Sequence, residues 1–227
     1  MPTFDIVKEI KADKTFRVQS VIGQFDLKNE HIKENFKGNI DIENKKWNIG
    51  AIVGSSGTGK STIAKKLFGN QLIQNFEYKE KSILDDMPEN SVKNICKIFN
   101  RVGFSSPPSW LKPYSVLSNG EKMRVDLARA LLEKRDLIVF DEFTSVVDRQ
   151  VAKIGSYAIA KTIRKENKKF IAVSCHYDIL DWLEPDWVFD ANTMSFFLPQ
   201  NTKDQKLNWK SENVTDHYGL NLGNIII

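Results

Sequence analysis

Residues 54–61 have the types and spacing that a polyphosphate site requires. They read Gly-Ser-Ser-Gly-Thr-Gly-Lys-Ser and fit the phosphate-loop pattern G-x-x-x-x-G-K-[ST]. Glycines let such a loop turn sharply and point its N–H groups inward, and the helix N-terminus that follows adds positive potential. We expect Lys60 to reach the β- and γ-phosphates and Ser61 to place its hydroxyl on Mg²⁺. An ordinary glycine-rich turn is the weaker interpretation, because chance seldom produces the whole pattern.

The loop needs a buried strand before it and a helix after it. Residues 47–53 are mostly apolar and short, which is typical of a strand in a parallel sheet. Residues 62–68, which begin with Thr62, carry apolar side chains at helical spacing, and Gly69 can end that helix. The flanking residues therefore favour the phosphate-loop interpretation.

Two adjacent carboxylates follow a second buried strand. Residues 137–140 are continuously apolar and lead into Asp141 and Glu142. At the tip of such a strand in a phosphate-loop protein, carboxylates handle Mg²⁺ and an attacking water. Another apolar run, residues 170–174, leads to His176. A lone histidine is usually structural, but one at the tip of a buried parallel strand faces the ligand edge.

The rest of the chain alternates between strand and helix patterns, which predicts an α/β fold. Phe25 lies near a turn, and periodicity alone assigns it to the core. Strands are predicted over residues 16–22, 39–43 and 82–87, helices over 91–99, 119–131 and 151–165, and a closing hairpin over 187–190 and 194–198. Ser118 or Asn119 is a suitable cap for the middle helix.

Composition limits the class of protein. With 227 residues, the chain can hold one α/β domain with a real core but not two. No apolar run approaches the length of a membrane-spanning helix, and the charged first residues do not resemble a signal peptide. The two cysteines lack metal-ligand spacing, which favours reduced thiols and a cytoplasmic protein. A net charge of +4 permits contact with nucleic acid without demonstrating it.

From about Phe16 to Leu198, the order of these pieces resembles the ATP-binding cassette (ABC) ATPases. Residues 117–121, Leu-Ser-Asn-Gly-Glu, resemble the family's LSGGQ signature, and residues 137–142 resemble its Walker B strand with the catalytic glutamate. Residues 145–148 resemble the D-loop, and His176 the switch histidine. These elements also follow one another in the family's order.

This resemblance implies an ABC-ATPase nucleotide-binding fold over residues 1–198. The fold would have a mostly parallel core sheet, antiparallel N-terminal strands and a shortened helical subdomain over about residues 88–130. Residues 199–227 would form a polar, basic tail. ATP and Mg²⁺ are the implied cofactors.

The resemblance also assigns roles to individual residues. Phe25 falls where the family places its adenine-stacking aromatic, which replaces the core assignment. Lys60, Glu142 and His176 would be catalytic, and Ser61, Asp141 and Asp85 would hold the metal. The implied nucleotide-binding residues are Phe25, Gly54, Ser55, Ser56, Gly57, Thr58, Gly59, Lys60, Ser61, Thr62, Ser118, Asn119, Gly120, Glu121 and Asp148.

Two departures from the family pattern bear on function. No glutamine lies at the expected Q-loop distance: Gln71 and Gln74 are too near the phosphate loop, so Asp85 or Asp86 is the expected substitute. The span from Lys60 to Leu117 is also short for the family. Transporter ATPases use these parts to grip their membrane subunits, so both departures argue against transport.

Residues 110–118, 141–149 and 174–178 resemble most closely a soluble branch of ABC-type ATPases found with acetyltransferase domains of the GNAT fold. This resemblance implies an ATP-dependent homodimer that switches a partner, either an acetyltransferase-fold protein or another DNA-acting or DNA-modifying protein. One alternative is the nucleotide-binding subunit of an ABC transporter. Another is a catalytically weak module that senses nucleotide.

Overall fold

The core of the protein is a six-stranded sheet in the order β4-β5-β6-β3-β7-β8, seen in a computed structural model that describes residues 3–11, 15–26, 31–79, 81–133 and 135–199. The first five strands in that order are parallel, and β8 is antiparallel to β7. The α/β fold with a mostly parallel sheet is therefore confirmed, as is the closing hairpin. The strands are β3 (Ile49–Val53), β4 (Leu72–Ile73), β5 (Leu137–Phe140), β6 (Lys169–Ser174), β7 (Trp187–Asp190) and β8 (Ser195–Phe197).

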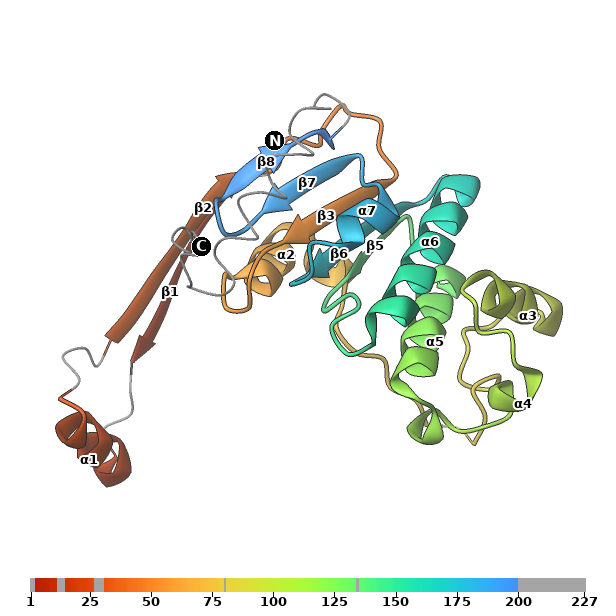
Figure 1. The fold of residues 1–227 in the computed structure, drawn as a ribbon, viewed down its shortest axis with the longest axis horizontal. Helices are drawn as coiled ribbons and strands as arrows, with labels where there is room; N and C mark the ends of the chain where they lie inside the picture. Colours follow the sequence, from red (N-terminus) through yellow and green to blue (C-terminus); the bar gives the residue numbers. More distant parts are fainter. Residues whose placement is uncertain (1–2, 12–14, 27–30, 80, 134, 200–227) are drawn as a thin grey trace, which may run out of the picture.

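Both faces of the sheet are buried, which explains the continuous apolar runs of its strands. In β6, Phe170 and Ala172 join the core on one face, whereas Ile171 and Val173 join the core on the other. One helix, α2, packs on the second face, while α5 and α6 lie on the first (Figure 1). The helices of this part are α2 (Lys60–Phe68), α5 (Asn119–Leu132), α6 (Arg149–Glu166) and α7 (Ile179–Leu183).

The N-terminal part is a long antiparallel hairpin of β1 (Thr3–Lys11) and β2 (His31–Asn39). Antiparallel strands were predicted in this part of the chain, but over residues 16–22 and 39–43. Residues 16–22 form most of α1 (Phe16–Gln24), a helix at the far end of the hairpin (Figure 1). The strand predicted over 39–43 is also wrong, because β2 ends at Asn39.

A smaller helical lobe lies between β4 and β5 in the chain and beside α6 in space (Figure 1). Its elements are α3 (Val92–Arg101), α4 (Pro107–Trp110), the 3₁₀ turn η2 (Tyr114–Val116) and α5, and another 3₁₀ turn, η1 (Gly69–Gln71), precedes β4. The strand predicted over residues 82–87 is wrong. The N–H groups of Ile83 and Leu84 donate to the carbonyl oxygens of Lys112 and Trp110, at 3.0 and 3.3 Å, instead of joining the sheet.

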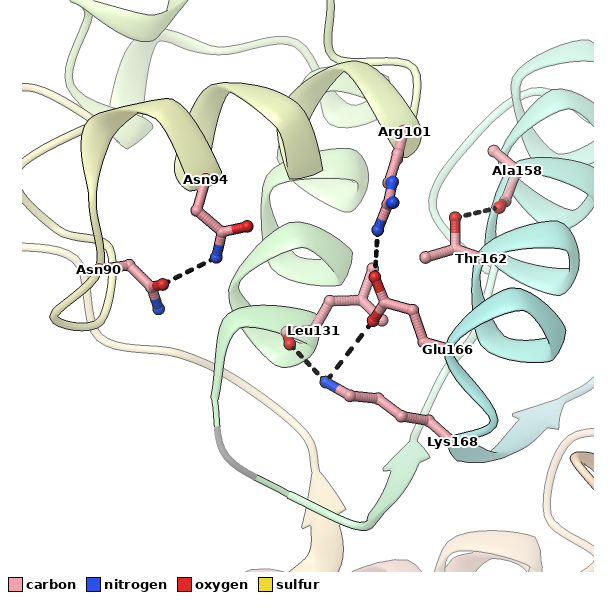
Figure 2. A network of polar contacts seen from close by, with 8 residues as sticks. All are labelled: Asn90, Asn94, Arg101, Leu131, Ala158, Thr162, Glu166 and Lys168. Carbon is pink, nitrogen blue, oxygen red and sulfur yellow. Dashed lines mark hydrogen bonds and ion pairs between the residues drawn. The ribbon is translucent and has the colours of Figure 1, made fainter.

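Polar contacts join three helices of the lobe and the core at their C-terminal ends (Figure 2). Arg101, the last residue of α3, is hydrogen-bonded to Glu166, the last residue of α6. The Nζ atom of Lys168 donates to the carbonyl oxygen of Leu131 at 2.8 Å and lies 3.9 Å from a Glu166 carboxylate oxygen. A cation at the end of α5 also complements the negative end of that helix dipole.

Within the described residues, no helix is both long enough and apolar enough to cross a membrane. The tail predicted at residues 199–227 lies outside the described residues, apart from Pro199. The described core extends to the end of β8, close to the domain boundary expected at Leu198.

The contact between β3 and β7 generates a stability prediction. Gly50 is paired with Trp187, and a Cβ atom at Gly50 would lie 2.1 Å from the indole ring. We expect Gly50→Ala to lower the free energy of unfolding by about 1–3 kcal/mol, because the buried indole, which packs against Trp47 and Phe196, would have to shift. Urea unfolding measures the change.

The matched control is Gly23→Ala in α1, where a Cβ atom would meet nothing within 4 Å. This substitution should be neutral or stabilising by up to about 1 kcal/mol, because alanine favours the helix. A Gly50→Ala protein with the wild-type unfolding midpoint would contradict the packing constraint.

Candidate functional site

The phosphate loop lies between the end of β3 and the start of α2, as the sequence predicts. Gly57 and Gly59 have φ angles of 87° and 82°, a region that favours glycine. A Cβ atom at Gly59 would also lie 2.6 Å from the ring of Phe36. The loop closes around the Ser55 carbonyl oxygen, which accepts hydrogen bonds from Lys60 Nζ at 2.7 Å and Thr58 Oγ1 at 2.9 Å.

The Asp141 carboxylate, at the tip of β5, brings two further side chains of the site together. Ser61 Oγ donates to one oxygen of Asp141 at 3.0 Å, and Gln74 Nε2 donates to the other at 3.1 Å. The backbone N–H of Asp141 donates to the carbonyl of Ile73 at 2.9 Å, which fixes the tip of β5 against the tip of β4. Asp141 is buried, with 5% of its surface exposed. The predicted metal ligands Ser61 and Asp141 are therefore in contact.

Glu142 follows in a backbone conformation that is rare for its residue type, with φ at 51°. One of its carboxylate oxygens accepts a hydrogen bond from Ser145 Oγ at 2.6 Å. The same hydroxyl lies 3.9 Å from Cys175 Sγ, at the tip of β6. The carboxyl ends of β5 and β6 thus bring Glu142 close to the residue that precedes His176.

Burial changes the pKa of two groups in the site. The pKa of Lys60 is lowered by burial, an effect opposed by the charges of Cys175, Glu142 and Asp141. The pKa of His176 is also lowered, first by burial and then by the charge of Arg149. Both effects favour the neutral form of the His176 imidazole.

Gln74 contacts the site, although its sequence position was expected to be too near the phosphate loop. It lies immediately after β4, and Ile73 of β4 is paired with Phe140 of β5, so Gln74 emerges next to Asp141. A glutamine that directly follows a short apolar pair was the signal in the sequence.

Asp85 and Asp86, the expected substitutes for the Q-loop glutamine, make other contacts in the structure. The Asp85 carboxylate accepts a hydrogen bond from Ser82 Oγ at 2.5 Å, and that of Asp86 accepts one from the Lys79 N–H at 2.9 Å. Asp85 is exposed and Asp86 is partly buried, and each carboxylate accepts a hydrogen bond from a residue close to it in the chain. In the structure, Gln74 and not Asp85 contacts the predicted metal ligand Asp141.

The structure places Phe25, the expected adenine-stacking residue, at the end of α1. Phe25 caps the C-terminus of α1 with 66% of its surface exposed, at the far end of the hairpin (Figure 1). Phe36, on β2, is the aromatic residue that contacts the phosphate loop. The five residues of β2 between Phe36 and the hairpin end alone span about 17 Å at the usual rise of a strand.

The signature-like residues form the start of α5. Ser118 is the N-cap in a capping box: its N–H and hydroxyl both donate to one Glu121 oxygen, at 3.0 and 2.9 Å. The other oxygen accepts from Ser109 Oγ at 2.8 Å. The Ser118 N–H and then the Ser109 hydroxyl lower the pKa of Glu121. Ser118 and Asn119 are exposed, so this turn is open to solvent.

The close packing of α5 against α6 explains two further predicted positions. A Cβ atom at Gly120 would lie 3.0 Å from Val151 Cγ1, so glycine permits the helices to approach. Asp148 is the N-cap of α6 and accepts hydrogen bonds from the N–H groups of Gln150 and Val151 at 3.0 and 2.9 Å. In a single copy of the chain, both residues therefore have structural roles.

The fold is similar to that of solved ATP-binding cassettes. A family model described as "ABC transporter" matches residues 70–145. The dimeric post-hydrolysis structure of the ATP-binding cassette MJ0796, bound to ADP and Pi, is similar with a TM-score of 0.59 at 16% identity, over 83% of this chain and 92% of that one.

Among curated proteins, the chain is similar to the zinc import ATP-binding protein ZnuC 1 of Aliivibrio fischeri, with 32% identity over 65% of this chain and 63% of the relative. It is also similar to the energy-coupling factor transporter ATP-binding protein EcfA1 of Clostridioides difficile, with 27% identity over 58% of this chain and 60% of the relative. The chain thus spans less than two thirds of the length of these relatives.

The contact between Gln74 and Asp141 generates a test of the metal site. We expect Gln74→Ala to raise the Mg²⁺ concentration for half-maximal ATP hydrolysis by roughly tenfold, because partners of metal ligands tune metal affinity. Asp85→Ala is the matched control and should leave this concentration unchanged. The reverse order of effects would return the metal role to Asp85.

Proposed function

We propose that the chain binds ATP with Mg²⁺ and hydrolyses the terminal phosphoanhydride bond, working as a dimer of two cassettes. The observation that carries this proposal is the meeting of Ser61 and Gln74 on the Asp141 carboxylate, beside Lys60 and the phosphate loop. The loop N–H groups and the N-terminus of α2 provide a site for anionic phosphates. The Lys60 ammonium would leave the Ser55 carbonyl to meet them.

The residues around Asp141 fit Mg²⁺ by their chemistry. This ion prefers hard oxygen ligands, usually keeps several waters, and needs only one or two protein ligands beside the phosphates. Ser61 and Asp141 provide hydroxyl and carboxylate oxygens 3.0 Å apart. When bound, Mg²⁺ neutralises charge that develops on the phosphate oxygens.

Glu142 and His176 are suited to the attacking side of the reaction. A water held by the Glu142 carboxylate would attack the γ-phosphorus, and the bond to the bridging oxygen would break to give ADP and phosphate. The neutral imidazole of His176 can donate a hydrogen bond to the γ-phosphate without carrying charge of its own. The bond from Ser145 restricts the Glu142 side chain before the water binds.

A dimer would use the exposed start of α5. Ser118 is exposed, and its hydroxyl, which is bonded to Glu121 in the single chain, can donate instead to an anion from outside the chain. The helix N-terminus behind it adds positive potential. We propose that this anion is the ATP phosphate of a second copy. The dimeric state of the similar MJ0796 cassette supports this arrangement.

The different roles of Lys60 and Glu142 give a direct test. We expect Lys60→Ala to weaken ATP binding, because it removes the cation that grips the phosphates. Glu142→Gln should keep ATP binding, lose hydrolysis by about 10²-fold or more, and accumulate as an ATP-loaded dimer. Titration with ATP, a phosphate-release assay and size measurements with ATP follow these effects. A monomeric Glu142→Gln protein with wild-type turnover would refute the role of Glu142.

We further propose that the partner of the dimer is a membrane transporter subunit. The sequence departures favoured an acetyltransferase-fold or other DNA-acting partner. The curated relatives instead support the transporter alternative, because ZnuC 1 and EcfA1 are both named as transporter ATP-binding proteins. Gln74 also removes one of the two departures that argued against transport. The cytoplasmic location expected from the sequence stays part of this proposal.

Capture of partners with tagged wild type and Glu142→Gln, with and without ATP, tests the transporter proposal. We expect a multi-helix membrane protein in the captured fraction, in an amount that depends on nucleotide. A DNA-acting protein or nucleic acid captured in its place would favour the switch expected from the sequence.

A further inference from the structure

We infer that Tyr78, Asp126 and Tyr114 form a clamp that holds the Ser118 turn in a fixed position relative to Gln74. We call these three residues the tyrosine clamp, and we assign them as positioning residues that never touch the nucleotide. The inference deepens the proposed function and rests on it for its effect on turnover. The claim that these residues hold the Ser118 turn in position concerns a single copy of the chain and does not depend on that function.

The first half of the clamp connects the metal site to α5. After Gln74, the chain leaves the sheet and runs along α5. The guanidinium of Arg129 lies over the rings of Phe76 and Tyr78, 4.9 and 4.8 Å from their centroids, and donates to the carbonyl oxygen of Glu77 at 2.7 Å. The segment that begins at Gln74 is therefore held against one face of α5.

The second half of the clamp joins both sides of the Ser118 turn to one carboxylate. Tyr78 Oη donates to one oxygen of Asp126 at 2.7 Å, and Tyr114 Oη donates to the other at 2.9 Å. The two phenol rings are stacked, with centroids 3.9 Å apart and an angle of 7° between the planes. Tyr114 precedes Ser118 in the chain and Asp126 follows it on α5, so their contact closes a loop around the turn.

This arrangement links the two halves of the site through a short chain of contacts. Gln74 meets Asp141, and Tyr78, a few residues later, meets the same Asp126 that holds the loop around Ser118. The half-buried Asp126 carboxylate accepts hydrogen bonds from two stacked phenols. Such hydrogen bonds fix the distance and direction between their partners more strictly than apolar packing alone does. A displacement of Gln74 is thus transmitted to the surface that would meet a second copy.

The test uses Tyr78→Phe, which removes one hydroxyl and keeps the ring stacked on Tyr114. Amide hydrogen exchange of the nucleotide-free protein measures how firmly the Ser118 turn is held. The N–H groups of Leu117, Glu121 and Lys122 are bonded to Tyr114 or Ser118, and their exchange should become roughly fivefold faster when the loop loosens. The amides of α6 should not change. Tyr157→Phe, at an exposed position on α6, is the matched control.

Steady-state hydrolysis examines the consequence. In Tyr78→Phe, we expect kcat to fall roughly tenfold with ATP affinity unchanged, because a small misplacement of a positioned group costs rate and not binding. A purely structural hydroxyl would lower the unfolding midpoint and leave kcat unchanged at temperatures well below it.

The outcomes separate the clamp from the proposed function. Unchanged exchange around Ser118 would overturn the clamp, whatever the turnover. Faster exchange with unchanged kcat in an active protein would overturn its positioning role. A wild-type protein that neither hydrolyses ATP nor dimerises with it would refute the proposed function. Faster exchange in Tyr78→Phe would still support the clamp in that case.

Discussion

The site depends on the hydrogen bonds that the Asp141 carboxylate accepts. This carboxylate lies buried at the tip of β5, and its oxygens accept hydrogen bonds from Ser61 on α2, Gln74 after β4 and the N–H of Glu142. A buried charge must be paired or hydrogen-bonded, so these donors stabilise it, and it in turn holds three separate segments together. Loss of the carboxylate would remove these three hydrogen bonds and leave the backbone bond from Asp141 to Ile73 to join β5 to β4.

One helix carries much of the connection between the lobe and the core. At its C-terminal end, the Leu131 carbonyl of α5 is bonded to Lys168, which lies beside the Arg101–Glu166 pair (Figure 2). In the second half of α5, Asp126 and Arg129 hold the segment that follows Gln74. These contacts all lie in the second half of α5, so they act on the Ser118 turn through the length of the helix.

Local signals predicted the parts of this structure that depend on neighbours in the chain. The phosphate loop, the apolar run before Asp141 and the Ser118 cap are each specified within a few residues. Phe16 to Ile22 contains β-favouring residues, yet a strand needs a partner, and the pairing of β1 with β2 leaves none there. Thr15 can instead accept a hydrogen bond from Val18 and start a helix. Gln74 was missed for the opposite reason, because its role comes from the pairing of β4 with β5, which sequence distance conceals.

The backbone at Glu142 has a consequence for how this chain can change. A side chain with φ at 51° costs about 1 kcal/mol that glycine would not, and Thr144, two residues later, is also in this region with φ at 67°. The same turn carries the carboxylate that we propose holds the reacting water. Selection for thermal stability alone would therefore drive position 142 towards glycine. A chain of this fold that has lost its activity should accumulate that replacement, and the residue at this position records whether the chemistry is still under selection.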